Sequence, residues 1–189
     1  MIRIGILGNI GSGKSYVAKN FGYPVFNADT EVGKLYKKDK KLFNKLRKVL
    51  PKHIFSFPVS KNEISTAILA KKINLKKIIK IVHLEIRKKM NIFLSKNKNK
   101  KIVILDIPLL LENKINKKND ILVFVESKKS DILKKLNKRK NFNLKLLNKF
   151  KNIQLSLDYK KKKSQFIIKN DFTKKSVKIG IKKIIKEIL

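Results

Sequence analysis

The sequence contains no cysteine, and it has 13 acidic residues against 49 lysines and arginines. The absence of cysteine excludes a disulfide framework, a thiolate nucleophile and a metal site with thiolate ligands. No apolar run approaches the roughly 20 residues of a membrane span. Arg3 interrupts the first apolar segment, which argues against a secretory signal peptide. We therefore expect a soluble, cytoplasmic protein that has no membrane partner.

Arginine is scarce as well. The formal net charge is +36, yet only four of the basic residues are arginines. Arginine is the usual reader of phosphate forks and base edges in nucleic acids. Apart from Lys14 and Lys19, the lysines are spread from residue 34 to the end of the chain and do not form one block. We therefore interpret the charge as solvated, lysine-rich faces and expect no specific nucleic-acid partner.

What the chain does contain is a full match to the phosphate-binding loop G-x-x-x-x-G-K-[ST], from Gly8 to Ser15. The apolar residues 2–7 precede this loop and a helix-compatible stretch, 16–21, follows it. Motif, spacing and flanks therefore agree better with a phosphate site than with a plain Gly/Ser turn. Backbone N–H groups can wrap a phosphate here, Lys14 can reach the outer phosphates, and the Ser15 hydroxyl can ligate Mg²⁺.

Strand-like and helix-like segments alternate along the 189 residues. A helical pattern fills most of residues 30–97, is interrupted between Pro51 and Pro58, and returns at the end of the chain. Apolar strands that alternate with helices predict an α/β fold with a parallel sheet covered on both sides. We expect the strands at residues 2–7, 23–26, 102–106, 121–125 and 165–168.

Two carboxylates follow predicted strands. From the end of its strand, Asp106 could reach a nucleotide-bound Mg²⁺, and a turn or helix-cap role is the alternative. Asp29 could orient or deprotonate an attacking hydroxyl, and it could also cap the helix that follows. Ligands in such sheets bind beyond the carboxyl ends of the strands, so we expect Asp29, Asp106 and the phosphate loop to converge.

His83 and Arg87 lie one helical turn apart in the predicted helical region. The pair could hold an anionic group of a substrate, or His83 could be a structural histidine on an apolar helix face. The sequence leaves both interpretations open. His53 has no partner pattern, and we assign it no role.

Motifs over nearly the whole chain match one known family. They are the phosphate loop, Asn27-Ala28-Asp29, His83-Leu84-Glu85-Ile86-Arg87, Ile107 to Asn113, Arg139, Gln154 and Asn170. In this pattern the chain resembles dephospho-coenzyme A kinases, and the stretch from Pro108 to Asn113 is its most specific part. The resemblance implies transfer of the γ-phosphoryl group of ATP to the 3′-hydroxyl of dephospho-coenzyme A, the last step of coenzyme A synthesis. Mg²⁺ would be the metal, and we expect a monomer.

The resemblance also implies an architecture. The family has a P-loop NTPase core with a five-stranded parallel sheet, a helical substrate-binding region and a lid. We expect the core at residues 1–29, 98–136 and 161–189. The helical insertion would then cover about 30–97 and the lid about 137–160.

Site residues follow from the same resemblance. Asp29, Lys14 and Arg139 would be catalytic, with Arg139 supplied by the lid, and Ser15 and Asp106 would hold the metal. ATP would bind Gly11, Ser12, Gly13, Lys14, Ser15, Tyr16 and Asn170, the last in a loop that faces adenine. The substrate would bind His83, Arg87, Pro108, Leu109, Leu110 and Glu112.

The chain departs from the family pattern at several of these positions. Asn27 replaces the first acid of an Asp-Ala-Asp motif, and Leu84 replaces a proline, so a helix can run through it. Lys135 replaces an arginine, which keeps the charge but loses the bidentate fork. Tyr16 and Asn9 replace threonine and glycine of the loop. The alternatives are another small P-loop kinase that acts on a nucleoside or nucleotide, and a nucleic-acid-binding P-loop protein.

Overall fold

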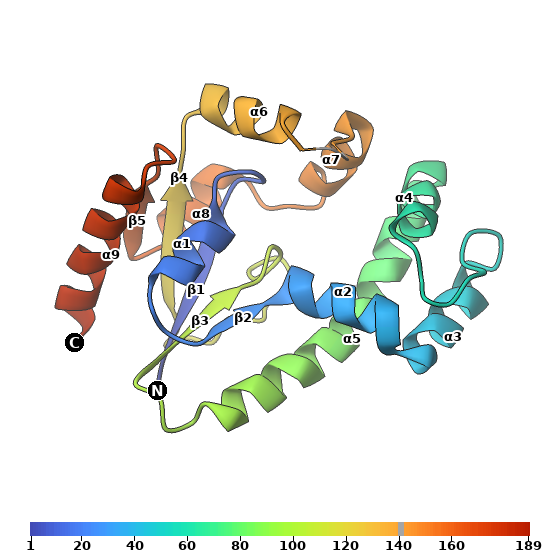
Figure 1. The fold of residues 1–189 in the computed structure, drawn as a ribbon, viewed down its shortest axis with the longest axis horizontal. Coiled ribbons are helices and arrows are strands. Elements are labelled where there is room, and N and C mark those ends of the chain that lie inside the picture. Colours follow the sequence, from blue (N-terminus) through green and yellow to red (C-terminus); the bar gives the residue numbers. More distant parts are fainter. Residues whose placement is uncertain (140–141) are drawn as a thin grey trace. The chain divides into compact units, whose positions relative to one another are not determined.

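In the computed structural model, which describes residues 1–139 and 142–189, five strands form one parallel sheet (Figure 1). The spatial order is β2-β3-β1-β4-β5, with β1 at the centre. The predicted α/β fold with a five-stranded parallel sheet is confirmed. The strands are β1 (Ile2–Gly8), β2 (Val25–Asn27), β3 (Ile102–Asp106), β4 (Ile121–Glu126) and β5 (Phe166–Lys169).

Helices connect successive strands along the chain, except between β3 and β4, where residues 107–120 form turns and irregular chain. The helices are α1 (Lys14–Asn20), α2 (Ala28–Lys38), α3 (Lys40–Val49), α4 (Lys61–Ala70), α5 (Lys72–Lys96), α6 (Lys129–Asn137), α7 (Leu144–Lys151), α8 (Leu157–Lys163) and α9 (Lys174–Ile188). None of the helices within the described residues combines the length and the apolar character that crossing a bilayer requires.

Alternating side chains give the sheet two different faces, because successive residues of a strand point in opposite directions. Ile4 and Ile6 of β1 belong to the core cluster that also contains residues of α1 and α9. Gly5 lies on the opposite face, where an added Cβ would come within 2.5 Å of Leu110. Glycine at this position therefore leaves room for the Leu110 side chain to pack against β1.

The chain divides into two compact units. The first contains the sheet and comprises Met1–Asn27, Asn97–Phe142 and Gln154–Leu189. The second is helical and comprises Ala28–Lys96 and Asn143–Ile153. The segment expected to form a lid, 137–160, is thus shared, because its helix α7 belongs to the helical unit, where it packs against α4.

Within the helical unit, α5 is one continuous helix. It passes through Leu84, whose side chain is exposed, so the expectation that leucine permits an unbroken helix here is confirmed. The buried stripe of α5 includes Ile78, Val82, Ile86 and Met90, which recur at four-residue steps. The carboxylate of Glu85 accepts a hydrogen bond from Lys45, which joins α3 to α5.

Glu63 of α4 is a buried acid that organises the break between α3 and α4. Its carboxylate accepts hydrogen bonds from the backbone N–H groups of Phe55, Ser56 and Ser60, and Ser60 completes a capping box at the start of α4. Burial alone raises the pKa of Glu63, but these hydrogen bonds outweigh burial and lower the pKa from 4.5 to about 2.

The substitution Glu63→Gln is expected to lower the free energy of unfolding at neutral pH by roughly 2–3 kcal/mol. The folded-state pKa lies below the unfolded one, so this stability is complete above the unfolded value of 4.5 and is lost as the pH falls through about 2. Urea unfolding at neutral pH and at about pH 3 measures the difference. Glu31→Gln, at an exposed ion pair with Lys34, is the matched control and should change stability by less than about 0.5 kcal/mol.

Candidate active site

The phosphate-binding loop connects β1 to α1, as the motif predicts. Gly11 and Gly13 have φ of 85° and 88°, a left-handed conformation that glycine adopts without strain. The Lys14 ammonium group donates hydrogen bonds to the carbonyl oxygens of Gly8 at 3.2 Å and Asn9 at 2.7 Å. The positive charge is therefore held against the loop itself, next to the start of α1.

The carbonyl oxygen of Ser12 is the anchor of this loop. It accepts two hydrogen bonds, one from the Ser127 hydroxyl at 3.0 Å and one from the Asn170 side-chain amide at 2.9 Å. Ser127 directly follows β4 and Asn170 directly follows β5. Two strands that lie on the same side of β1 thus hold one peptide group of the loop in place.

Asn170 is also buried, with 2 % of its surface exposed. Its side-chain oxygen accepts a hydrogen bond from the backbone N–H of Phe172, and a Cβ added to Gly13 would come within 2.4 Å of its side-chain nitrogen. Both polar ends of the Asn170 side chain are therefore engaged with protein groups. A contact of this residue with adenine stays a prediction.

Helix α6 and the segment after β5 flank the loop. Ile132 and Leu136 of α6 would lie 3.0 Å from a Cβ added to Gly11, so glycine permits a close approach here. The Lys135 ammonium group lies 5.4 Å from the centre of the Phe172 ring, a cation–π distance. Lys135 thus keeps its positive charge beside the loop, although it lacks an arginine fork.

Asp106 ends β3 and is paired in register with Asn27, the last residue of β2. The Asn27 amide donates a hydrogen bond to the Asp106 carboxylate, which is 3 % exposed. An acid at position 27 would set two carboxylates against each other at this spot. The departure from the family pattern therefore removes one negative charge and supplies a donor to Asp106.

The stretch from Pro108 to Asn113 forms a turn directly after β3. Leu110 is completely buried against the side of β1 that carries Gly5. Its side chain therefore belongs to the hydrophobic core, and the structure does not support the expected contact with substrate. Pro108 and Leu109 are half-buried and remain within reach of a ligand.

Glu112, in the same turn, has an unexpected partner. Its carboxylate lies 2.7 Å from the ammonium group of Lys160 in α8, and Lys160 is 1 % exposed. The same carboxylate oxygen accepts a hydrogen bond from the Leu155 backbone N–H, and Lys160 donates to Gln154. These contacts hold residues 154 and 155, where the last segment of the sheet unit begins, against the turn that contains Glu112. The second oxygen of Glu112 is buried and has no hydrogen-bond partner among the described residues.

The remaining predicted residues lie elsewhere in the two units. Asp29 is the second residue of α2, inside its first turn, so it is not the residue that precedes the helix as a cap. His83 and Arg87 share one side of α5, one turn apart, as expected. Arg139 is exposed just beyond α6, and residues 140–141 after it lie outside the described residues.

The loop hydroxyls and Tyr16 differ in accessibility. Ser15 and Tyr16, in the first turn of α1, are exposed and can meet a ligand. Ser12 is fully buried, and its hydroxyl has no hydrogen-bond partner among the described residues. Ser12 therefore offers a ligand its backbone and not its side chain.

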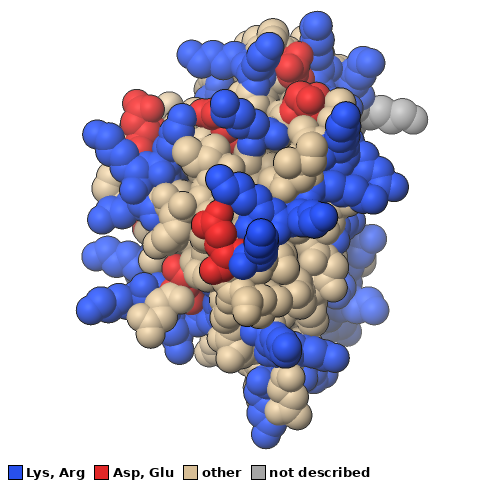
Figure 2. Space-filling view, turned by 90° about the vertical axis from the view of Figure 1, so that its left-hand side faces the viewer, with Lys and Arg blue, Asp and Glu red and all other residues tan. Residues whose placement is uncertain are grey.

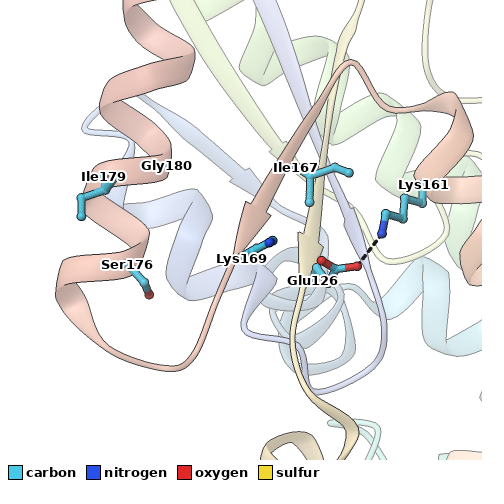
Figure 3. A pocket seen from close by; sticks show the side chains of 7 residues that line it. All are labelled: Glu126, Lys161, Ile167, Lys169, Ser176, Ile179 and Gly180. Atoms are coloured by element: carbon cyan, nitrogen blue, oxygen red, sulfur yellow. Dashed lines mark hydrogen bonds and ion pairs between the residues drawn. The ribbon is translucent and has the colours of Figure 1, made fainter.

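A hollow of about 430 Å³ lies along the edge strand β5, between α8 and α9 (Figure 3). Glu126 and Lys161 form an ion pair of 2.6 Å in its wall, and Ile167 and Ile179 are exposed beside it. None of the predicted site residues lines this hollow. Glu126 and Lys169 line this hollow, whereas Ser127 and Asn170, the residues that follow them in the chain, donate hydrogen bonds to the phosphate loop.

Three residues near the site, Ser127, Phe172 and Lys160, were not predicted from the sequence. A signal for Ser127 was available, because every second residue of β4 faces α1, and Ser127 continues the series that contains Val123 and Val125. Lys160 had no such signal, since it stands in a run of four lysines of which it alone is buried.

Known proteins resemble this chain in sequence over about two thirds of its length. The chain is similar to dephospho-CoA kinases of Wolbachia sp. subsp. Brugia malayi, 35 % identical over 127 residues, and of Wolbachia pipientis wMel, 36 % identical over 129 residues. These matches cover 65 % and 66 % of this chain, and the chain spans the same 65 % and 66 % of the length of these relatives.

Solved structures extend the likeness over the whole fold. A Thermus thermophilus protein has a TM-score of 0.79 at 22 % identity, covering 100 % of this chain and 98 % of that protein. The dephospho-CoA kinase of Campylobacter jejuni has a TM-score of 0.65 at 21 % identity, covering 98 % and 96 %. At these identities the likeness establishes the P-loop kinase fold.

The family assignment comes from a match between this sequence and a protein-family model. The family model described as dephospho-CoA kinase matches residues 2–176, which includes the phosphate loop, the turn after β3 and Asn170. The match extends over far more than half of the chain. With the loop built on β1 and Asp106 at the end of the neighbouring strand, it leads to one conclusion: this chain belongs to the dephospho-CoA kinase family.

Proposed function

We propose that this protein transfers the γ-phosphoryl group of ATP to the 3′-hydroxyl of dephospho-coenzyme A, giving coenzyme A and ADP. The observation that carries the proposal is the phosphate loop within a family match from residue 2 to residue 176. The loop would bind the phosphates of ATP, and the turn from Pro108 to Asn113, which follows β3, carries the most specific part of the resemblance to the family. The reaction belongs to phosphoryl transfer, in which positioning and charge neutralisation supply most of the catalysis.

Residues of the loop hold the nucleotide in this proposal. The backbone N–H groups from Gly11 to Ser15 donate to phosphate oxygens at the positive end of α1. Lys14 exchanges its two carbonyl partners in the loop for the outer phosphates. Tyr16 is exposed on the first turn of α1 and contributes to the nucleotide side.

The donor atoms available fit a magnesium ion. Ser15 offers a hydroxyl and Asp106 a carboxylate, and Mg²⁺ in such sites is held by one or two protein oxygens together with phosphates and water. No group of three acids or histidines is gathered among the described residues, which agrees with a metal bound through the nucleotide. When bound, the ion would neutralise charge on the phosphates.

On the acceptor side, Asp29 orients the ribose hydroxyl in line with the γ-phosphorus. The hydroxyl oxygen forms the new P–O bond, the bond from the γ-phosphorus to the bridging oxygen breaks with its electron pair leaving on ADP, and Asp29 accepts the hydroxyl proton. His83 and Arg87 hold an anionic group of the substrate, and Pro108, Leu109 and Glu112 frame the acceptor. Arg139 neutralises the transferring phosphoryl group and helps to exclude water.

Two other functions are less well supported. Shikimate kinase from Bacteroides thetaiotaomicron shares the fold with a TM-score of 0.51 at 12 % identity, so the fold by itself accommodates other acceptors. A nucleic-acid-binding role would favour a concentrated basic patch. On the face seen in Figure 2, lysine and arginine side chains are instead scattered, with acidic and uncharged residues between them.

A coupled ADP-release assay over several acceptors tests the proposed function. We expect turnover with dephospho-coenzyme A and none above background with shikimate, nucleosides or nucleoside monophosphates. Lys14→Ala should abolish this turnover because the ammonium group no longer reaches the phosphates. Lys19→Ala, at an exposed position of the same helix, is the matched control and should keep full activity. Preference for a nucleoside monophosphate would refute the proposed acceptor.

The substitution Asp29→Asn is expected to lower kcat by about 10²-fold or more, the scale of a positioned general base. Steady-state kinetics with dephospho-coenzyme A measures the effect. Asp39→Asn serves as control, since Asp39 caps α3 in the same helical unit and asparagine caps a helix equally well. Near-normal turnover of the Asp29 variant would reject its role.

The substitution Asn27→Asp should make stability depend on pH and on magnesium. It sets a second, half-buried carboxylate against the buried Asp106, and two like charges at hydrogen-bond distance raise the pKa of one of them. We expect a loss of roughly 1–3 kcal/mol at neutral pH without divalent cations, recovered at about pH 5 or with Mg²⁺. Thermal unfolding measures it. Asn27→Ala adds no charge and should show neither dependence, and an Asn27→Asp variant that behaves the same way would contradict the expectation.

A further inference from the structure

The strand ends next to the loop carry two hydrogen-bond donors of different kinds. Ser127 continues the side-chain series of Val123 and Val125, and Asn170 continues that of Ile168, so both face the layer that contains α1. Their donor atoms lie 3.0 Å and 2.9 Å from the same carbonyl oxygen, that of Ser12. We propose that Ser127, together with Asn170, sets the orientation of the Ser12–Gly13 peptide and thereby the affinity of the loop for ATP.

The geometry of a peptide group gives the reason. In a planar trans peptide the C=O and the following N–H point in opposite directions. Because the Ser12 carbonyl points toward Ser127 and Asn170, the N–H of Gly13 points away from them. A phosphate in the loop is bound by such N–H groups, so fixing the carbonyl on one side aims the donor on the other.

Because residue 13 is glycine, the orientation of the Ser12–Gly13 peptide group has to be fixed by contacts with other residues. The φ of Gly13, 88°, lies in a region where glycine has several accessible conformations, so the chain itself does not hold the peptide in one orientation. Two donors that converge on one buried carbonyl restrict the peptide rotation more than a single donor would. The loop is then ordered before a nucleotide binds, which lowers the entropic cost of binding.

The two donors are not equivalent. Asn170 is tied down at several points, since its backbone N–H donates to the Glu126 carbonyl and its side-chain oxygen accepts from Phe172. Ser127 is half-buried, and its hydroxyl donates to Ser12. Removing the Ser127 hydroxyl therefore changes the loop with little disturbance elsewhere, and this makes Ser127 the informative position.

This inference deepens the nucleotide side of the proposed function. Ser127 acts as a positioning residue, because it works through the loop backbone and has no role in the transfer itself. The expected signature is a change in the affinity for ATP with the KM for the acceptor unchanged. General destabilisation of the protein would not separate the two substrates in this way.

The test is calorimetric titration of ATP and Mg²⁺ into the protein without acceptor. Ser127→Ala is expected to weaken ATP binding by about 3- to 10-fold, the effect of one lost hydrogen bond. Ser164→Ala is the matched control, because the Ser164 hydroxyl also donates to a backbone carbonyl, that of Lys160 at 2.9 Å in α8. The control variant should bind ATP as the unchanged protein does.

A second pair of variants separates the hydroxyl from the shape of the side chain. Ser127→Thr keeps the hydroxyl and should retain the affinity for ATP. Ser127→Val introduces a side chain of nearly the same shape as threonine but without a hydrogen-bond donor, and should lower the affinity for ATP. Equal ATP affinity for the threonine and valine variants, or for Ser127→Ala and the unchanged protein, would overturn the inference. The ADP-release assay with several acceptors tests the proposed function independently, since ATP binding is measured here without any acceptor.

Discussion

The parallel pairing of β1 with β3 on one side and β4 on the other is the constraint on which the candidate site depends. Parallel strands end at the same edge of a sheet, so the loop that leaves β1 emerges between Asp106, which ends β3, and Ser127, which follows β4. β5 extends the same edge and adds Asn170. A shift of one residue in any of these registers would turn the polar side chain to the other face of the sheet.

Acidic side chains are few in this protein, and several of them are committed to the interior. Glu63, Asp106 and Asp120 are buried, and each accepts a hydrogen bond from a partner within its own unit. Glu112 is held by the buried Lys160. Removing a partner from such a pair leaves an uncompensated buried charge, which costs far more than losing an exposed ion pair. The few buried carboxylates therefore contribute more to the stability of the fold than their number suggests. The many exposed lysines contribute little.

The departures from the family pattern have local physical explanations where the structure describes them. Asn27 converts a pair of acids into a hydrogen-bonded amide and carboxylate. Leu84 allows α5 to continue as one helix, and Lys135 keeps a charge over the Phe172 ring.

The sequence by itself determined the features that neighbouring residues encode. The spacing from Gly8 to Ser15 specified the loop, and strand and helix periodicity predicted the parallel α/β fold, with the largest shift at the short β2, which begins at Val25. Only the tertiary structure decided that Leu110 is core, that Lys160 is buried against Glu112, and that α7 belongs with the helical unit. The hydrogen bonds of Ser127 and Asn170 to Ser12 join residues 115 and 158 positions apart. Such contacts are set by strand register and helix packing, and a local pattern carries no information on which distant residues those will bring together.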